Sequence, residues 1–222
     1  MSAAIVVFSG GQDSTTCLGL AIRQHGKENV SCITFHYGQR HALEVEVANK
    51  MAASLGIRTH HIISLDNYAD LTRSALLDPT LKITAQTADA PPNTVVDGRN
   101  MLFLLLAAVV AKRDGIHDIY TGVCQADSSG YPDCRDTFIK ACNVTLNLAM
   151  DYNFQIHTPL MFLNKMQIWA LADELGMLER IANETLTCYN GIIGPGCGSC
   201  PSCHLRQRGY AAYLQAKSTP CA

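Results

Sequence analysis

The chain has 222 residues, of which 48% are hydrophobic and 16% are charged. A chain of this length buries about 70% of its unfolded surface, so it supports a full core without disulfides, and its apolar content excludes disorder. Lys and Arg number 17 and Asp and Glu number 19, a net charge of −2. Proteins built to bind tRNA or DNA usually carry a basic excess, so the charge disfavours nucleic acid as a partner.

Neither a membrane span nor a secretory signal is expected. The longest apolar run, over 101–111, has about half of the ~20 residues that a membrane-spanning helix needs. The apolar stretch 5–8 is too short for a signal peptide and lacks a basic segment before it. We therefore expect a cytoplasmic protein that does not contact a membrane.

Strand-like and helix-like segments alternate from the start, which predicts βαβ units and a largely parallel sheet. The expected strands are 5–8, 30–35, 60–65, 118–122 and 154–158, and the expected helices are 14–24, 43–55, 100–113, 135–150, 164–175 and 205–215. The helix over 100–113 is apolar nearly all round, which predicts burial on most sides. The segment 68–94 shows no period and is interpreted as an irregular insertion, a candidate lid.

The loop after the first strand suits a bound phosphate. Ser9-Gly10-Gly11-Gln12-Asp13-Ser14, followed by Thr15 and Thr16, joins this strand to a helix. The glycines permit close backbone approach, and the amides at a helix start favour an anion. The hydroxyls and the carboxylate could bind phosphate oxygens and Mg²⁺. An ordinary turn capped by Ser14 is the alternative. The loop is not a Walker loop or a GxGxxG motif, because it lacks the residues of both.

The hexapeptide SGGQDS resembles the SGGxDS signature of the N-type ATP pyrophosphatases, the PP-loop superfamily. This resemblance implies an adenine nucleotide alpha-hydrolase-like fold, an α/β Rossmann-like parallel sheet of about five strands with helices on both faces. It also implies cleavage of ATP to AMP and pyrophosphate, with Asp13 helping to bind Mg²⁺. The residues implied to hold ATP are Phe8, Ser9, Gly10, Gly11, Gln12, Asp13, Ser14, Thr15, Thr16, Cys17 and Leu18.

Four further segments narrow the resemblance. They are YGQRH at 37–41, GRN at 98–100, SGYPDCR at 129–135 and TCYN at 187–190. Nearly the whole chain is similar to the 7-cyano-7-deazaguanine synthase family of queuosine biosynthesis, although Asp97 stands where that family usually has proline. The resemblance implies a homodimeric ligase that converts 7-carboxy-7-deazaguanine and ammonia to 7-cyano-7-deazaguanine. The expected intermediates are an adenylated carboxylate and an adenylated amide, and each ATP yields AMP and pyrophosphate.

Four cysteines lie within 16 residues near the C-terminus: Cys188, Cys197, Cys200 and Cys203. Their spacing and number suit a closed tetrahedral zinc site. An iron–sulfur cluster is an alternative, but the fuller ferredoxin spacing is absent; unligated thiols are another. The resemblance implies structural Zn²⁺ at all four positions. We accordingly divide the chain into an ATP-binding Rossmann-like PP-loop domain over 1–180 and a zinc-binding segment over 181–222.

Several polar residues follow predicted strands and share the edge of the sheet where ligands bind. Asp13, Lys165 and Arg99 are the expected catalytic residues, with Lys165 contacting phosphate as the resemblance suggests. The expected substrate-binding residues are Arg40, His41, Asp127, Asp133 and Arg135. A carboxylate of Asp133 or Asp127 would accept hydrogen bonds from the amino-pyrimidinone edge of a guanine-like ring. Each could instead be a solvated or capping residue, and Cys134 could be a nucleophile.

Three other functions stay open. A tRNA-thiolating PP-loop enzyme would need a basic surface or an extra domain, and neither is evident. An NAD-synthetase-like amide ligase shares the loop, but only the YGQRH and SGYPDCR segments argue against it. A non-catalytic nucleotide-binding zinc protein would bind ATP without turning it over. A glutaminase domain would need considerably more chain, so we expect free ammonia to be used.

Overall fold

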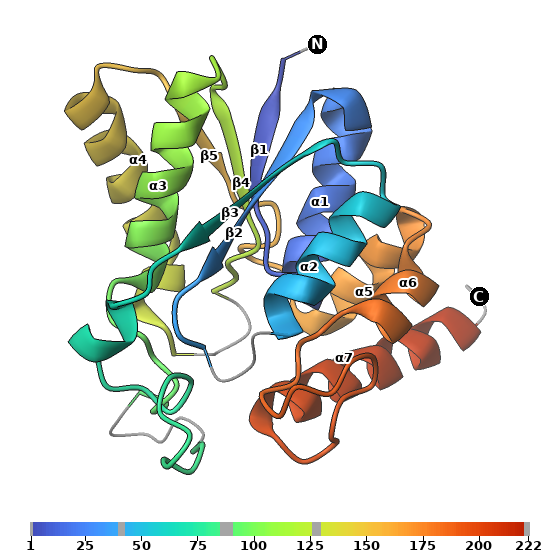
Figure 1. The fold of residues 1–222 in the computed structure, drawn as a ribbon. Coiled ribbons are helices and arrows are strands. Elements are labelled where there is room, and N and C mark those ends of the chain that lie inside the picture. Colours follow the sequence, from blue (N-terminus) through green and yellow to red (C-terminus); the bar gives the residue numbers. More distant parts are fainter. Residues whose placement is uncertain (1, 40–42, 85–90, 126–129, 220–222) are drawn as a thin grey trace.

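Five parallel strands form one sheet in the order β3-β2-β1-β4-β5 (Figure 1). The strands are β1 (Ala4–Val7), β2 (Val30–His36), β3 (Thr59–Ser64), β4 (Asp118–Thr121) and β5 (Gln155–His157). The computed structural model describes residues 2–39, 43–84, 91–125 and 130–219. The arrangement confirms the predicted Rossmann-like sheet, with β1 at its centre.

Helices cover both faces of this sheet. They are α1 (Gln12–His25), α2 (Leu43–Ser54), α3 (Arg99–Arg113), α4 (Asp136–Met150), α5 (Lys165–Glu174), α6 (Leu178–Glu184) and α7 (Pro201–Ser218). In Figure 1, α3 and α4 lie on one side of the sheet, and α1 and α2 lie on the other. Successive side chains of a strand point to opposite faces. Ile5 of β1 therefore joins the core under α3 and α4, and Val6 joins the core under α1 and α2.

The C-terminal segment packs against α5 near the carboxyl ends of the strands. Trp169 of α5 and Tyr213 of α7 are both buried in a small core that also includes Ile181 of α6. The indole Nε1 of Trp169 donates to the carbonyl oxygen of Arg206 at 3.2 Å. This packing holds the cysteine cluster beside the sheet domain.

The structure corrects three expectations about helices. The helix α3 is not buried nearly all round, because Met101, Leu105 and Val109 are 40 to 51% exposed along one of its faces. The short helix α6 was not expected from the sequence. The last helix begins at Pro201 instead of 205, because Cys200 acts as its N-cap and proline suits the first helical position.

None of the helices in the described ranges combines the length and the apolar content needed to cross a membrane.

Candidate active site

A cavity of about 320 Å³ opens at the carboxyl ends of β1 and β4. The strand order reverses between these two strands, and such a switch point is where open α/β sheets bind ligands. The volume lies at the lower end of the roughly 300–1,000 Å³ range of small-molecule sites. One end of the cavity is formed by the loop after β1, and the other by aromatic and charged side chains from separate segments.

Two glycines allow the loop after β1 to approach its neighbours. Gly10 has a φ of +73°, and a Cβ there would lie 2.8 Å from the backbone nitrogen of Ala48 in α2. At Gly122, which follows β4, a Cβ would lie 2.9 Å from the backbone of Asp13 and Ser14. Larger residues at either position would push the loop away from the sheet edge, so glycine is required at both.

The hydroxyl of Ser14 closes this loop. It accepts a hydrogen bond from the Ser9 amide and lies 3.2 Å from the Gly11 carbonyl oxygen, to which it donates. The N-cap of α1 is Gly11, so Ser14 is not the capping residue of this helix. The helix begins at Gln12, two residues earlier than expected, because the loop contributes its own residues to the first turn. The amides at this helix start suit an anion.

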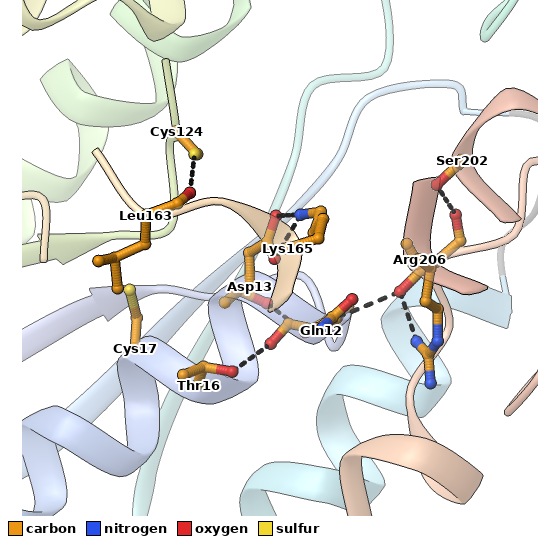
Figure 2. Close-up of polar contacts among 12 residues, drawn as sticks. Gln12, Asp13, Thr16, Cys17, Cys124, Leu163, Lys165, Ser202 and Arg206 are labelled. Atoms are coloured by element: carbon orange, nitrogen blue, oxygen red, sulfur yellow. Dashed lines mark hydrogen bonds and ion pairs between the residues drawn. The ribbon is translucent and has the colours of Figure 1, made fainter. Parts of the chain in front are cut away.

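Asp13 and Lys165 both line the cavity, and Figure 2 shows that their side chains point toward each other. The Nζ of Lys165 lies 2.8 and 2.6 Å from the two carboxylate oxygens of Asp13. Lys165 is the first residue of α5, and a capping box between Asn164 and Gln167 fixes that helix start. The lysine side chain is only 8% exposed. The structure thus brings together two of the three residues that we expected to be catalytic.

Only part of the expected ATP-binding stretch lines the cavity. Its lining members are Phe8, Ser9, Gly11, Gln12, Asp13 and Ser14. Cys17 and Leu18 are fully buried in the core, and burial raises the pKa of the Cys17 thiol. The hydroxyl of Thr16 donates to the carbonyl oxygen of Gln12. These side chains support the loop from behind, and the prediction that all eleven residues hold ATP stays a prediction.

The far end of the cavity is aromatic with two charged groups. Tyr37, Phe103, Tyr131 and Tyr189 line it, together with Arg99 and Glu44. The guanidinium of Arg99 lies 5.8 Å from the ring centroid of Tyr131. The Tyr131 hydroxyl contacts the hydroxyls of Thr94 at 2.6 Å and Tyr189 at 3.3 Å. Flat aromatic walls beside a cation and a carboxylate suit a planar polar ring.

Glu44 was not among the residues selected from the sequence. It stands in the first turn of α2, where a carboxylate is ordinarily explained by the helix dipole. Burial raises the pKa of Glu44 to about 7, and the nearby charge of Arg99 lowers it by a smaller amount. No local signal distinguishes it from its exposed neighbour Glu46, because only the fold turns it toward the cavity.

The expected substrate-binding residues have different positions. Asp133 does not line the cavity; its Oδ2 accepts from the backbone amide of Asn100 in the first turn of α3. Arg135 is exposed. Arg40, His41 and Asp127 lie outside the described residues. The substrate roles of all five stay predictions.

Cys134 lines the cavity, but its environment does not favour a nucleophile. Burial, and to a smaller extent the charge of Asp133, raises the pKa of its thiol to about 12. The thiolate is the reactive form of cysteine. At neutral pH this side chain therefore stays protonated.

The turn before α3 positions Arg99. The Arg99 amide donates to the carbonyl oxygen of Val96 at 3.2 Å, and Gly98 has a φ of +71°. These features indicate a type II turn with Asp97 in its second position. The Asp97 carbonyl accepts from the hydroxyl of Tyr68. The turn is therefore anchored although the family's proline is missing.

Cys188, Cys197, Cys200 and Cys203 come together, with their four sulfur atoms within 4.8 Å of one another. Zinc–sulfur bonds of about 2.3 Å place the sulfurs of a tetrahedral site about 3.8 Å apart, and Cys197 and Cys203 are separated by 3.9 Å. The Ser199 hydroxyl and backbone amides lower the pKa of the Cys197 thiol to about 5. The cluster fits Zn²⁺, and its four thiolates leave no place for a substrate.

The C-terminal segment also reaches the cavity. Leu186, Thr187, Tyr189 and Ser202 are among the lining residues. The Leu186 amide donates to the carbonyl oxygen of Gly10 at 3.1 Å, which ties this segment to the loop after β1. The expected division at residue 180 therefore does not separate the site, because both parts supply its walls.

Comparison with solved structures finds similar chains at low sequence identity. A predicted subunit of tRNA methyltransferase from Methanocaldococcus jannaschii has 19% sequence identity and a TM-score of 0.50, over 78% of this chain and 75% of that one. An NH3-dependent NAD synthetase from Campylobacter jejuni has 17% identity and a TM-score of 0.48, over 81% and 66% of the two chains. The NMN synthetase from Francisella tularensis has 17% identity and a TM-score of 0.44, over 81% and 64%.

The comparison with protein-family models is more specific. The model described as "Queuosine biosynthesis protein QueC" matches residues 3–214, which is nearly the whole chain. The matched range includes the loop after β1, the residues at the aromatic end of the cavity and all four clustered cysteines. The chain belongs to the QueC family of queuosine biosynthesis proteins.

Proposed function

We propose that the protein is a ligase that converts 7-carboxy-7-deazaguanine and ammonia to 7-cyano-7-deazaguanine with two molecules of ATP. Membership of the QueC family supports an ATP-dependent PP-loop enzyme of queuosine biosynthesis. The observation that carries the finer proposal is that one cavity joins the loop after β1 to an aromatic end with Glu44 and Arg99. A nucleotide phosphate and a planar base can thus meet in one place.

In the first half-reaction, an oxygen of the substrate carboxylate attacks the α-phosphorus of ATP. The bond to the bridging oxygen breaks, pyrophosphate leaves, and an acyl-adenylate remains. Ammonia then attacks the acyl carbon, loses a proton and displaces AMP to give the amide. The loop amides and Lys165 stabilise the charge that builds on pyrophosphate. Bound Mg²⁺, for which Asp13 is the candidate ligand, would neutralise phosphate charge.

In the second half-reaction, the amide oxygen attacks the α-phosphorus of a second ATP and pyrophosphate leaves again. The amide nitrogen gives up its two protons as the bond from carbon to the adenylated oxygen breaks. AMP departs and the nitrile forms. Both halves need the same contacts to phosphate, so one loop serves both.

We place recognition of the base at Glu44 instead of Asp133, because Glu44 lines the cavity and the Asp133 carboxylate is bonded to the start of α3. An ionised carboxylate accepts the two hydrogens of an amino-pyrimidinone edge in a paired geometry. Arg99, at the same end, is the candidate partner of the substrate carboxylate. Replacing Asp133 with asparagine distinguishes recognition by Glu44 from recognition by Asp133. If Glu44 recognises the base, this replacement should change the KM for the base little.

We also propose a cytoplasmic homodimer that acts on the free base, not on tRNA. The net charge of −2 supports a small-molecule substrate. Exposed apolar side chains on neighbouring helices, Leu105 and Val109 of α3 and Leu148 of α4, support association of two copies. Sedimentation equilibrium at micromolar concentration should give twice the mass of the chain; a single-chain mass would contradict the dimer.

The decisive experiment incubates the purified protein with ATP, Mg²⁺, ammonium and 7-carboxy-7-deazaguanine. The base is followed by mass spectrometry, and AMP and pyrophosphate are counted. We expect the nitrile with two AMP per product. Cleavage of ATP without conversion of the base would indicate that the enzyme activates a different carboxylic acid, as an NAD-synthetase-like ligase would. Binding of ATP without any cleavage would indicate a non-catalytic nucleotide-binding protein.

A further inference from the structure

Thr187 lies where the C-terminal segment meets the start of α1. Its Oγ1 accepts a hydrogen bond from the backbone amide of Gln12 at 3.2 Å. It also accepts from Nη1 of Arg206 at 2.8 Å. The two contacts come from opposite ends of the chain: Gln12 begins α1, and Arg206 stands in α7.

The contact to Gln12 substitutes for a missing cap. The N-cap of α1 is Gly11, which has no side chain to bond the first amides of the helix. A larger residue at that position would crowd the C-terminal segment, because a Cβ would lie 3.3 Å from the Leu186 carbonyl oxygen. The hydroxyl of Thr187 therefore satisfies this amide from 175 residues away.

Hydrogen bonds hold the guanidinium of Arg206 in one orientation. Its side chain is buried, and Nη2 donates to the carbonyl oxygens of Ile181 at 2.7 Å and Ala182 at 3.1 Å. Nη1 donates to the hydroxyl of Thr185 at 2.7 Å as well as to Thr187. In Figure 2, Arg206 and Lys165 lie on opposite sides of Gln12.

The charge of Arg206 also bears on the site. Among the residues that the structure describes, its hydrogen bonds go to neutral hydroxyl and carbonyl oxygens. The Asp13 carboxylate and the Cys203 thiol interact with the guanidinium through space only, and a buried cation creates a positive potential around it. That potential favours an anion next to Thr187.

A hydroxyl has two acceptor lone pairs and one donor hydrogen. Gln12 and Arg206 occupy both acceptor positions of Thr187, so only its hydrogen remains for a ligand. Thr187 lines the cavity beside Gly11 and Asp13 of the loop after β1. The C-terminal segment thus presents a hydrogen-bond donor, with a cation behind it, to the place where phosphate would bind.

We propose that Thr187 donates this hydrogen to a phosphate oxygen of the bound nucleotide, and that Arg206 is a positioning residue that keeps the hydroxyl a donor. This inference rests on the proposed function only in taking ATP as the ligand. The nucleotide site is then built from both ends of the chain.

The test measures equilibrium binding of ATP with Mg²⁺ by calorimetry. Thr187→Val removes the hydroxyl at nearly constant shape, and Thr187→Ser keeps it. Loss of a hydrogen bond to a charged oxygen corresponds to a roughly 10- to 100-fold loss of affinity. We expect that loss for T187V and a change of less than about 3-fold for T187S.

Thr185→Val is the matched control. Thr185 accepts from the same Nη1 of Arg206 at 2.7 Å, but it is fully buried and does not line the cavity. We expect T185V to bind ATP nearly as the natural protein does. Zinc content and melting temperature, measured for each variant, show whether the fold is kept.

A double-mutant cycle tests the role of Arg206. If the arginine acts through Thr187, then Arg206→Met weakens ATP binding and adding T187V weakens it little further. Independent, additive losses would overturn the positioning role.

The remaining outcomes separate the inference from the proposed function. Equal ATP affinity of T187V and the natural protein, or an equal loss in T185V, would overturn the contact between Thr187 and phosphate. If the natural protein converts no 7-carboxy-7-deazaguanine, the proposed reaction is overturned. If T187V but not T185V still binds ATP more weakly in that case, the contact between Thr187 and phosphate stands.

Discussion

The two ends of the cavity are built in different ways. The loop after β1 is one continuous hexapeptide, and its hydrogen bonds between Ser9, Gly11 and Ser14 are local. The aromatic end takes side chains from segments far apart in the sequence, including Tyr37, Glu44 and Tyr189. A continuous segment can predict a phosphate site because the backbone amides at a helix start favour an anion. Shape and charge for a base need side chains that only the fold brings together.

Removing the lysine of the Lys165–Asp13 pair should give the largest effect. Lys165→Ala deletes a buried cation at the phosphate end and leaves the Asp13 carboxylate without this partner. We expect kcat to fall about 10²- to 10³-fold, the usual effect of losing one group that stabilises transition-state charge. The measurement is the rate of pyrophosphate release at saturating ATP and base.

Arg23→Ala is the matched control for this prediction. Arg23 of α1 and Glu174 of α5 form a second ion pair between the same two helices, at 2.6 Å and in an exposed position. Exposed pairs contribute about 0–1 kcal/mol to stability, so kcat should be unchanged. A comparable loss of kcat in both variants would assign the effect to helix packing.

Loss of the metal should affect both ends of the cavity at once, because Thr187 and Tyr189 flank Cys188. Cys200→Ser should lower the zinc content and loosen α7 from α5. A cost of at least about 3 kcal/mol corresponds to a melting temperature roughly 10 °C lower in a chain of this size. ATP affinity should fall with it.

The scattered Cys142 provides a control for the zinc prediction. It is a buried residue of α4 and belongs to a different core from the four clustered cysteines, so Cys142→Ser should destabilise the fold without changing zinc content. Metal analysis and calorimetry on the same samples check both variants. Full zinc binding by Cys200→Ser would contradict a site of four thiolates.

Glu44→Gln should act on the base and spare ATP. A site that hydrogen-bonds its substrate discriminates strongly against an analogue that cannot pair. We expect the KM for the base to rise about 10- to 100-fold while the KM for ATP is kept, since one or two hydrogen bonds to a charged group are lost. Glu46→Gln, in the same helix turn but exposed, should change neither constant.

The protonation of Glu44 predicts how the affinity for the base changes with pH. Burial raises the pKa of Glu44 to about 7, and only the carboxylate accepts two hydrogen bonds. Binding of the base should therefore improve as the pH rises through 7, and E44Q should lose this dependence. Stability should change in the opposite direction: the folded state holds the proton more tightly, so the contribution of Glu44 falls as the pH rises from about 4.5 to 7. Base affinity that does not depend on pH would contradict the assignment.

The sequence predicts features that lie in one continuous segment better than features that are assembled from distant segments. The loop after β1, the parallel sheet and the cysteine cluster were all predicted, because glycine-rich turns, strand and helix periods and CxxC spacing are local patterns. Asp13 and Lys165 were both selected, but their contact joins positions 152 residues apart and was not expected.

The residues that were missed have no local pattern. Glu44 resembles any acid at a helix start, and Thr187 resembles any hydroxyl beside a cysteine. The exposed face of α3 was misjudged because hydrophobic residues around a helix do not show which of them the neighbouring elements cover. Contacts across the fold decide these cases.

The smallest expected effect concerns Asp97, where the family has proline. Asp97 occupies the second position of the type II turn from Val96 to Arg99, and Gly98 follows with a φ of +71°. Proline suits that position because its fixed φ matches the turn. Asp97→Pro should therefore raise the free energy of unfolding by about 0.4–1 kcal/mol, by reducing the freedom of the unfolded chain. Arg99 should keep its place, so the KM for the base should not change. Urea denaturation with base kinetics checks both expectations, and a destabilised variant would mean that the backbone at Asp97 differs from a type II turn.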